Sequence, residues 1–379
     1  MTDVFKNLSR QLKGVFPAAR IEILPGARDD EHAWTIIVHP RGEGDIFKTV
    51  RIVGEEGIPL RVGGRTPDGR PPIIPGGAVR IDMTGMDRIL ELDDQSHLVR
   101  VQVGVSVAVL QSRLAERELM LGWSTHGETP HTLGAVFSGA VPVRWGARHE
   151  SPTAGVRALK AVLPGGGVIT STPAPRRATG PDLKQLLLGT RGRLGILSEV
   201  SLRVHPWPEA QLVVVADVPV GRITGLGTVL QEQVRPHLLE IDVGSDGAAH
   251  VMASLHGTAA EVSAARSALS GALDVPMEDA PGVPPGIAPM GDDLALSWTA
   301  FAAFVEAWNA GSKPKPFRVK RMTGVGVVLS GGGAFARKKA TEALGFWYAS
   351  GGSSTRHLQA IKATLDPRNI LGALGDGRP

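Results

Sequence analysis

Two glycine-rich stretches are the parts of this chain whose residue types could bind a ligand through the backbone. Residues 62–69 read VGGRTPDG and follow the apolar run 57–60, and residues 188–195 read LGTRGRLG and lead into the strand-like run 196–202. Glycine adopts backbone conformations that other residues avoid, so a glycine-rich loop at a strand end can turn its N–H groups toward phosphate oxygens. The two stretches predict a phosphate-binding site, and a simple turn is the alternative for each glycine.

Other motifs lack the context that their chemistry needs. Gly324 and Gly326 are followed by a strand pattern rather than a helix, which argues against the dinucleotide fingerprint. Residues 330–339 lack the Gly, Lys and Thr spacing of a phosphate loop. His126 and His131 have no third ligand nearby, so we expect no metal site. No serine elbow motif is present. The glycine-rich stretches therefore remain the main signal.

Composition limits the class of protein. The 379 residues are 42% apolar and 21% charged, which is typical of a soluble globular protein with about two domains. The formal net charge of +4 is spread along the chain, and it serves either solubility or the lining of an anionic cofactor site. Aromatic residues make up only 4%, so we expect no nucleic-acid partner.

The chain contains no cysteine, which excludes disulfides, thiolate metal sites, iron–sulfur clusters and a cysteinyl flavin bond. Residues 1–13 lack the apolar segment of a signal peptide. No apolar run reaches the roughly 18 residues of a membrane span. We expect a cytoplasmic protein without a membrane span.

The spacing of apolar residues predicts mixed secondary structure up to a boundary at Pro206 and Pro208. One helix is expected over 1–13. A second helix is expected to begin at a Ser106 cap and to run to about residue 119. Strands are expected over 57–62, 78–83, 89–93, 98–104, 156–163, 168–171 and 196–204. Residues 124–146 show almost no periodicity but contain four glycines, and a loop of this length in a compact domain is typically functional.

After the boundary, the pattern predicts a small α+β unit with antiparallel strands. Strands are expected over 212–218, 238–243, 249–255 and 324–329, helices over 228–234, 259–273, 334–344 and 354–365, a linker over 276–293 and a turn over 330–333. A further helix carries Phe301, Phe304, Val305 and Trp308 on one face.

The order of these blocks resembles the FAD-binding domain of the vanillyl-alcohol oxidase superfamily, the PCMH-type flavin fold. The blocks are the first glycine stretch, the runs 81–83, 101–105 and 132–135, the second glycine stretch, and the closing run 365–367. The resemblance covers roughly residues 45–208 and 355–375. It is strongest to glycolate oxidase flavin subunits, D-lactate dehydrogenases and alkyldihydroxyacetonephosphate synthases.

The resemblance implies a set of FAD-binding positions. The family's pyrophosphate loop corresponds to 63–69, its second loop to 132–135 with a continuation toward the flavin ring, and its last loop to 189–199. The implied cofactor-binding residues are Gly63, Gly64, Arg65, Thr66, Gly69, Thr132, Leu133, Gly134, Ser138, Gly139, Gly192, Gly195 and Ile196. Arg144, His126, His131 and His357 are candidates for a substrate ligand or base, and the catalytic residue is unassigned.

Three departures from the family pattern affect the expectation. Arg65 stands where relatives have a third glycine or a histidine that bonds FAD, so we expect non-covalent FAD. The Arg65 side chain then either pairs with phosphate or crowds it. Ala135 replaces a glycine at a point where the backbone approaches the cofactor. The short cap lacks the histidine-rich block of the D-lactate dehydrogenase branch. In this respect the chain is more similar to the smaller FAD-binding subunit of glycolate oxidase.

We therefore predict an α+β fold with a two-subdomain PCMH-type FAD-binding domain and a small antiparallel α+β cap. The expected units are an N-terminal helix and lead-in (1–30), the FAD-binding domain (31–208), a reduced cap or substrate domain (209–345) and a C-terminal segment returning to the FAD domain (346–379). The predicted function is FAD-dependent oxidation of a small hydroxy acid or alcohol by hydride transfer to flavin N5. A partner oxidoreductase subunit is also expected. The alternative is a flavin-fold subunit with a degenerate FAD site that serves as a non-catalytic assembly partner.

Overall fold

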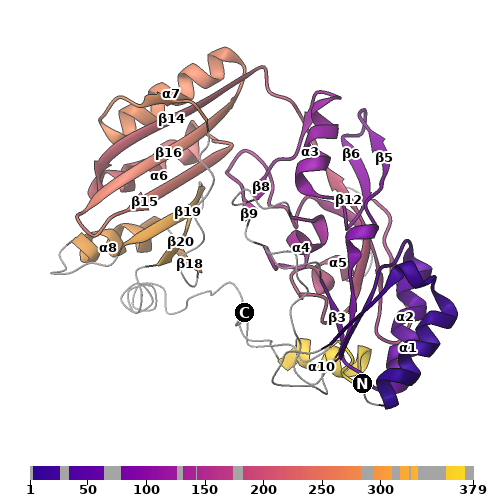
Figure 1. Cartoon of the computed structure of the whole chain (residues 1–379). Helices are drawn as coiled ribbons and strands as arrows, with labels where there is room; N and C mark the ends of the chain where they lie inside the picture. The colour runs from indigo at the N-terminus through magenta and orange to yellow at the C-terminus, as the bar shows by residue number, and fades with distance from the viewer. Residues whose placement is uncertain are drawn as a thin grey trace.

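The computed structural model describes residues 3–25, 34–63, 78–125, 131–141, 143–173, 182–282, 293–296, 298–309, 316–323, 326–331 and 356–371. These residues form two lobes (Figure 1). One hydrophobic core runs from Phe5 to Val204 and includes Ile370 and Leu371 from the end of the chain. A second core runs from Val214 to Val319.

The first lobe contains a mixed four-stranded sheet in the order β1-β2-β4-β3. Its strands are β1 (Ile21–Pro25), β2 (Trp34–Val38), β3 (Leu60–Val62) and β4 (Ala78–Ile81). The strand β4 pairs in parallel with both β2 and β3. Helices α1 (Asp3–Val15) and α2 (Glu43–Glu56) lie together beside this sheet (Figure 1). The strand predicted over 57–62 is shorter because Gly57, with a φ of 66°, ends α2 in the left-handed region.

The same lobe contains an antiparallel five-stranded sheet in the order β11-β10-β12-β6-β5. Its strands are β5 (Ile89–Asp93), β6 (Leu98–Gln102), β10 (Val156–Val162), β11 (Val168–Thr170) and β12 (Ile196–Arg203). Helix α3 (Val107–Ala115) begins after Ser106, as predicted, but ends earlier than predicted. It is followed by the short strand β7 (Leu119–Met120), which pairs with β13 (His205–Pro206). Helix α5 (Leu183–Leu187) precedes the second glycine stretch.

The prediction that residues 124–146 lack regular structure was wrong. They contain the paired strands β8 (Ser124–Thr125) and β9 (Val143–Arg144) and the helix α4 (Leu133–Phe137). The Thr132 side chain caps α4 by accepting a hydrogen bond of 3.2 Å from the Ala135 amide. These elements are too short to show a periodic pattern, since each depends on contacts with the rest of the lobe.

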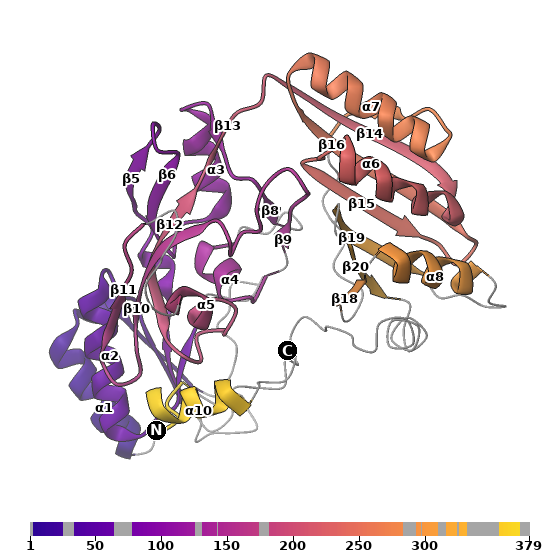
Figure 2. The same cartoon turned by 180° about the vertical axis from the view of Figure 1, so that it is seen from behind.

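The second lobe is a seven-stranded sheet in the order β17-β14-β16-β15-β19-β20-β18, and every pair of neighbouring strands is antiparallel. Its strands are β14 (Ala210–Pro219), β15 (Leu238–Val243), β16 (Ala248–Gly257), β17 (Glu278–Ala280), β18 (Asp293–Leu296), β19 (Phe317–Thr323) and β20 (Gly326–Gly331). The 3-10 helix η3 (Val220–Gly225) and helices α6 (Leu226–Glu232), α7 (Ala259–Leu273) and α8 (Trp298–Asn309) pack on one face (Figures 1 and 2).

Several predictions for this lobe needed correction. Helix α7 has the predicted bounds, and the four large residues predicted on one face of α8 are all buried. The predicted linker contains β17, and the predicted turn at Ser330 and Gly331 is the end of β20. Strand β19 was missed because Arg318 interrupts its apolar pattern; its guanidinium is buried in an ion pair with Asp242. The helix predicted over 334–344 lies outside the described residues.

The end of the chain packs on the first lobe. Helix α10 (Arg356–Leu365) lies below the first lobe near the N-terminus (Figure 1). The Leu60 amide of β3 donates a 2.6 Å hydrogen bond to the Ile370 carbonyl, and Arg193 donates one of 3.1 Å to the Leu371 carbonyl. Residues 370 and 371 are thereby fixed beside β3 and the second glycine stretch.

The Asp366 carboxylate organises this return. It accepts hydrogen bonds from the Ile370 and Leu371 amides at 2.9 and 3.0 Å, and it forms a buried ion pair with Lys362.

We expect Asp366→Asn to lower the free energy of unfolding by about 1–2 kcal/mol, because the amide keeps part of the hydrogen bonding but not the charge. Urea unfolding tests this, with the exposed Asp217→Asn as control; equal midpoints for both variants contradict it.

Candidate functional site

Three glycine-bearing segments meet in the first lobe. Gly139, just after α4, has a φ of 78°, and a Cβ placed on it would lie 3.1 Å from the Gly189 Cα. Gly192 has a φ of 73°, and its Cβ would lie 3.3 Å from the Val62 Cβ at the end of β3. A side chain at Gly139 or Gly192 would therefore be strained by the backbone conformation and crowded by its neighbours. The fold brings together regions that are far apart in sequence.

Hydrogen bonds fix this junction. The Gly189 amide donates to the Phe137 carbonyl at 2.9 Å, and the Arg191 amide donates to the Ser138 carbonyl at 2.8 Å. Arg191 itself has a φ of 52°, which is uncommon for a residue with a side chain. The 189–192 loop is therefore held against the end of α4.

Not all the predicted cofactor residues reach this junction. Gly63, Ser138, Gly139 and Gly192 lie at it, whereas Leu133 and Ile196 are fully buried and contribute their side chains to the core. Gly195 faces Leu187, 3.1 Å from where its Cβ would be. Thr132 caps α4, and Gly134 packs beside Val103. Gly64, Arg65, Thr66 and Gly69 lie outside the described residues.

The backbone amides at this junction are largely engaged within the chain. Gly63 donates to the Ile81 carbonyl at 3.1 Å, Leu133 to Val105 at 3.0 Å and Gly134 to Val103 at 2.7 Å. Gly189 and Arg191 are engaged as described above. Among the described residues, the Gly63, Gly189 and Arg191 amides of the junction are therefore already engaged, so an anion beside them would need other hydrogen-bond donors.

Positive side chains supply that possibility. Arg61 on β3 and Arg191 and Arg193 in the second glycine stretch flank Val62 and Gly192. Partial burial lowers the pKa of Arg193, and the charges of Arg61 and Arg191 lower it further. The Lys362 ammonium donates to the Arg193 carbonyl at 2.7 Å. Burial likewise lowers the pKa of Lys362, against the opposing effect of Asp366. Sequence reasoning missed this cluster, although two of its arginines lie inside a predicted loop.

The two lobes meet along residues 144–149. The Arg144 guanidinium of β9 makes a bidentate ion pair with Glu240 of β15, with Nε–Oε1 and Nη2–Oε2 distances of 2.7 and 2.6 Å. Gly146 packs so closely that a Cβ would lie 2.4 Å from the carbonyl oxygens of both Pro236 and His237. The Arg148 amide donates to the same Pro236 carbonyl at 3.2 Å. Arg144, a predicted substrate ligand, thus joins the lobes.

Four histidine rings, called the histidine stack below, lie close together across this boundary, and of these the His237 and His256 rings are parallel. His149 and His205 belong to the first lobe and have ring centroids 4.1 Å apart, and His237 and His256 belong to the second lobe and stack at 4.0 Å. The centroids of His149 and His237 are 5.3 Å apart. Burial is the main cause that lowers the pKa of His237 to about 2, of His149 to about 3, and of His205 and His256 to about 4. These rings are neutral at neutral pH, and they were not singled out by sequence.

The remaining histidine candidates lie elsewhere. His131 is half-buried, and its carbonyl accepts the Val107 amide at 2.9 Å, immediately before the Thr132 cap. His357 lies on α10, and His126 lies outside the described residues. No group of three or more potential metal-ligating residues is close enough to hold a metal ion within the described ranges.

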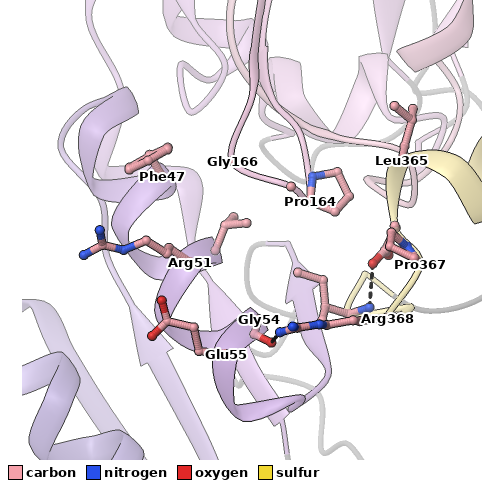
Figure 3. Close-up of a pocket in the computed structure, with 13 residues that line it drawn as sticks. Phe47, Arg51, Gly54, Glu55, Pro164, Gly166, Leu365, Pro367 and Arg368 are labelled. Atoms are coloured by element: carbon pink, nitrogen blue, oxygen red, sulfur yellow. Dashed lines mark hydrogen bonds between the residues drawn. The ribbon is translucent and has the colours of Figure 1, made fainter.

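Three cavities within the described residues lie away from the glycine junction. One of about 270 Å³ lies between α2, the turn 164–166 and the chain end, with Phe47, Pro164 and Pro367 around it (Figure 3). Two more, of about 380 and 260 Å³, are both lined by Arg148, His256 and Glu261 beside the histidine stack.

Comparison with known proteins finds a likeness in the first lobe. The family model described as "FAD binding domain" matches residues 34–172. The mitochondrial D-lactate dehydrogenase [cytochrome] of Arabidopsis thaliana is 31% identical over 192 residues, which cover 48% of this chain and 32% of that protein. The aligned part thus spans about a third of that relative's length.

Solved structures extend the likeness to both lobes. An alkyldihydroxyacetonephosphate synthase structure aligns with a TM-score of 0.72 and 16% identity, covering 96% of this chain and 84% of that one. The 4-ethylphenol oxidase of Gulosibacter chungangensis aligns with a TM-score of 0.69 and 13% identity, covering 98% of this chain and 96% of that one. At these identities the alignments establish the fold, which is the predicted PCMH-type fold with an antiparallel cap.

The residues at the glycine junction fit a diphosphate-bearing cofactor. Gly139 and Gly189, both with positive φ, bring two backbone segments together without side chains, and Gly192 lies against the Val62 side chain. Arg61, Arg191 and Arg193 supply positive charge beside them. No carboxylate forms an ion pair with these three arginines in the part of the chain that the structure describes.

No helix among the described residues is both long and apolar enough to cross a membrane.

A substitution at Gly139 tests the junction. We expect Gly139→Val to weaken FAD binding at least tenfold, because a β-branched residue is strained at positive φ and would displace Gly189. Quenching of flavin fluorescence during titration measures the affinity. Gly165→Val is the matched control, since a Cβ there meets nothing within 4 Å. Equal affinities for the two variants contradict the assignment.

Proposed function

We propose that this chain, a member of the PCMH-type family of FAD-linked oxidoreductases, binds FAD non-covalently at the glycine junction and oxidises a small hydroxy acid or alcohol. The observation that carries the proposal is the meeting of Val62–Gly63, Ser138–Gly139 and Gly189–Gly192 beside three arginines. Bound FAD would supply the hydride acceptor, flavin N5.

The chain's own residues would do three things. The glycines would let the backbone approach the cofactor, and the arginines would balance its diphosphate charge. The Arg144–Glu240 pair and the close contact at Gly146 would hold the cap against the FAD-binding lobe, which fixes the distance between substrate and cofactor. A protein base would take the hydroxyl proton as the hydride leaves.

The hydroxy-acid substrate class rests on the likeness to D-lactate dehydrogenase. Anaerobic addition of D-lactate, L-lactate or glycolate to the flavin-loaded protein tests it. Oxidation of the acid reduces the flavin, and the reduced flavin loses its visible absorption. Bleaching by at least one of these acids supports the proposal. A flavin-loaded protein that none of them reduces, and that simple alcohols also leave oxidised, contradicts catalysis of this class.

The second candidate is a non-catalytic flavin-fold subunit that works as an assembly partner in a glycolate-oxidase-like complex. Arg65 and Ala135 favour it from the sequence, and the internal hydrogen bonds of the Gly63, Leu133 and Gly134 amides favour it from the structure. A protein that cannot be loaded with FAD, but co-purifies with an oxidoreductase subunit when co-expressed, would support this alternative.

A further inference from the structure

The histidine stack lies where the second lobe meets the first. The His149 and His205 rings belong to the first lobe and the His237 and His256 rings to the second, and the centroids of His149 and His237 are 5.3 Å apart across the boundary. Each lobe has its own hydrophobic core. Beside the stack, cavities of about 380 and 260 Å³ are lined by residues of both lobes. The lobes are therefore joined here by ring and polar contacts rather than by a shared core.

The buried ring nitrogens have no place for a second proton. The Nδ1 atoms of His237 and His256 are buried and have no hydrogen-bond partner among the described residues. The Nε2 atom of His256 lies 3.1 Å from the Ser254 Oγ. A protonated imidazole carries a hydrogen on both nitrogens, so each of these Nδ1 atoms would hold a buried N–H without an acceptor. The closed junction therefore disfavours protonated rings.

The charges around the stack give a protonated ring no counterion. Burial is the first cause that lowers the pKa of all four histidines, and the positive charge of Arg148 adds to it in each case. The Glu150 carboxylate is held by Arg157 at 2.6 Å, and the Glu261 carboxylate accepts the amide that begins α7 at 2.7 Å. The charged and titratable groups around the rings are His97, Arg148, Glu150, Arg157 and Arg203 before the lobe connection, and Glu209, Glu232, Arg235 and Glu261 after it.

The chain has a pivot beside the stack. The Trp207 amide donates a 2.7 Å hydrogen bond to the Glu118 carbonyl, which fixes the chain to the first lobe up to this residue. Pro206 and Pro208 restrict the backbone on both sides of Trp207. The second lobe begins with β14 at Ala210. A rotation of the second lobe would therefore take place about residues 208–210, next to His205.

Opening of this junction relieves the cost of protonation. A ring that leaves the junction reaches water and regains the ordinary proton affinity of histidine, so the open form binds protons first as the pH falls. We propose that the histidine stack is an acid-sensitive switch, which holds the lobes together while its rings are neutral and lets them separate when the rings are protonated. Separation also exposes the Arg144–Glu240 pair, whose charges then become solvated. Each lobe keeps its own core, so separation precedes unfolding.

Energy transfer between one dye on each lobe measures the separation. The chain contains no cysteine, so Ser112→Cys on α3 and Ser267→Cys on α7 provide two labelling positions, both of them exposed. We expect transfer to be constant above about pH 7 and to fall between about pH 6.5 and 5, while the far-UV circular dichroism stays native. The ratio of open to closed protein should rise on the order of tenfold per pH unit for each ring that is released.

Variants of the stack identify the groups that titrate. His237→Gln combined with His256→Gln removes both rings of the second lobe. This double variant should take up fewer protons on opening, by up to two, so that transfer falls less steeply with pH. His250→Gln, a half-exposed histidine on the same strand as His256, is the matched control and should follow the native curve. Rings with a purely structural role would instead lower the transfer of the double variant at every pH and leave the steepness unchanged.

The measurement uses the chain without added flavin, so its outcome is independent of the proposed function. A fall in transfer that precedes any loss of circular dichroism, and that is less steep in the double variant, is the expected result. Transfer that stays constant down to about pH 5, or that falls only together with the circular dichroism, would overturn the switch. The same conclusion would follow if the double variant kept the native steepness.

Discussion

Glu240→Ala should lower the free energy of unfolding by about 3 kcal/mol, because it leaves the buried Arg144 guanidinium without its carboxylate. The two side chains are only 4% and 12% exposed, so water can replace little of the lost interaction. The effect should appear in denaturant unfolding, and it should be accompanied by faster proteolysis at the connection between the lobes, near residues 207–209.

Matched variants separate the loss of charge from the loss of packing. Glu240→Gln keeps the size and one acceptor and should cost less than Glu240→Ala. The double variant Arg144→Met with Glu240→Leu should recover much of the stability, since both buried charges of the pair are removed together. Glu232→Ala, at an exposed position of the same lobe, is the control. The interpretation is wrong if Glu240→Ala unfolds with the same midpoint as this control.

Acidification should destabilise the protein strongly between pH 6.5 and 5 through the histidine stack. Each of the four rings has a folded-state pKa below the ordinary value of 6.5, mainly through burial. The unfolded chain therefore binds protons first as pH falls, and stability is lost below about pH 6.5 until the folded-state values, about 2 to 4, are reached. The rings are partly exposed, so we discount the full linkage value and expect about 3 kcal/mol in total by pH 5.

The free energy of unfolding measured at half-unit pH intervals tests this. His237→Gln removes the ring with the lowest pKa. It should lower the number of protons taken up on unfolding by up to one, so that stability falls less steeply as the pH falls. His250→Gln is the matched control, because His250 is half-exposed at the surface beside Asp217. If both variants show the slope of the native chain, the histidine stack does not control acid stability.

Much of the fold followed from local signals. Helix α7 begins at a capping box formed by Thr258 and Glu261, and its bounds were predicted correctly. The runs of apolar residues located all five strands of the antiparallel sheet of the first lobe. Strand β19 escaped prediction because the buried Arg318 is stabilised by a residue 76 positions away, which no local pattern contains.

The site was predictable only in part, because its groups come together through tertiary contacts. The glycines of the second stretch and the turn at Gly139 were found from their sequence order, and the structure places them in contact. The arginine cluster joins β3 to a loop about 130 residues later, and the lobe junction joins Arg144 to Glu240 across 96 residues. The four stacked histidines are isolated residues in the sequence. None of these charged residues and histidines was part of a periodic pattern, so only the fold reveals their proximity.

The central claim is that the glycine junction binds FAD without a covalent bond. The most direct measurement is the visible spectrum of the purified chain after incubation with excess FAD and gel filtration, followed by acid precipitation. The account predicts flavin absorption bands in the blue and near-ultraviolet that move entirely to the supernatant on precipitation, in a ratio close to one FAD per chain. A colourless protein after reconstitution would contradict FAD binding, and flavin that stays with the precipitate would contradict the non-covalent mode.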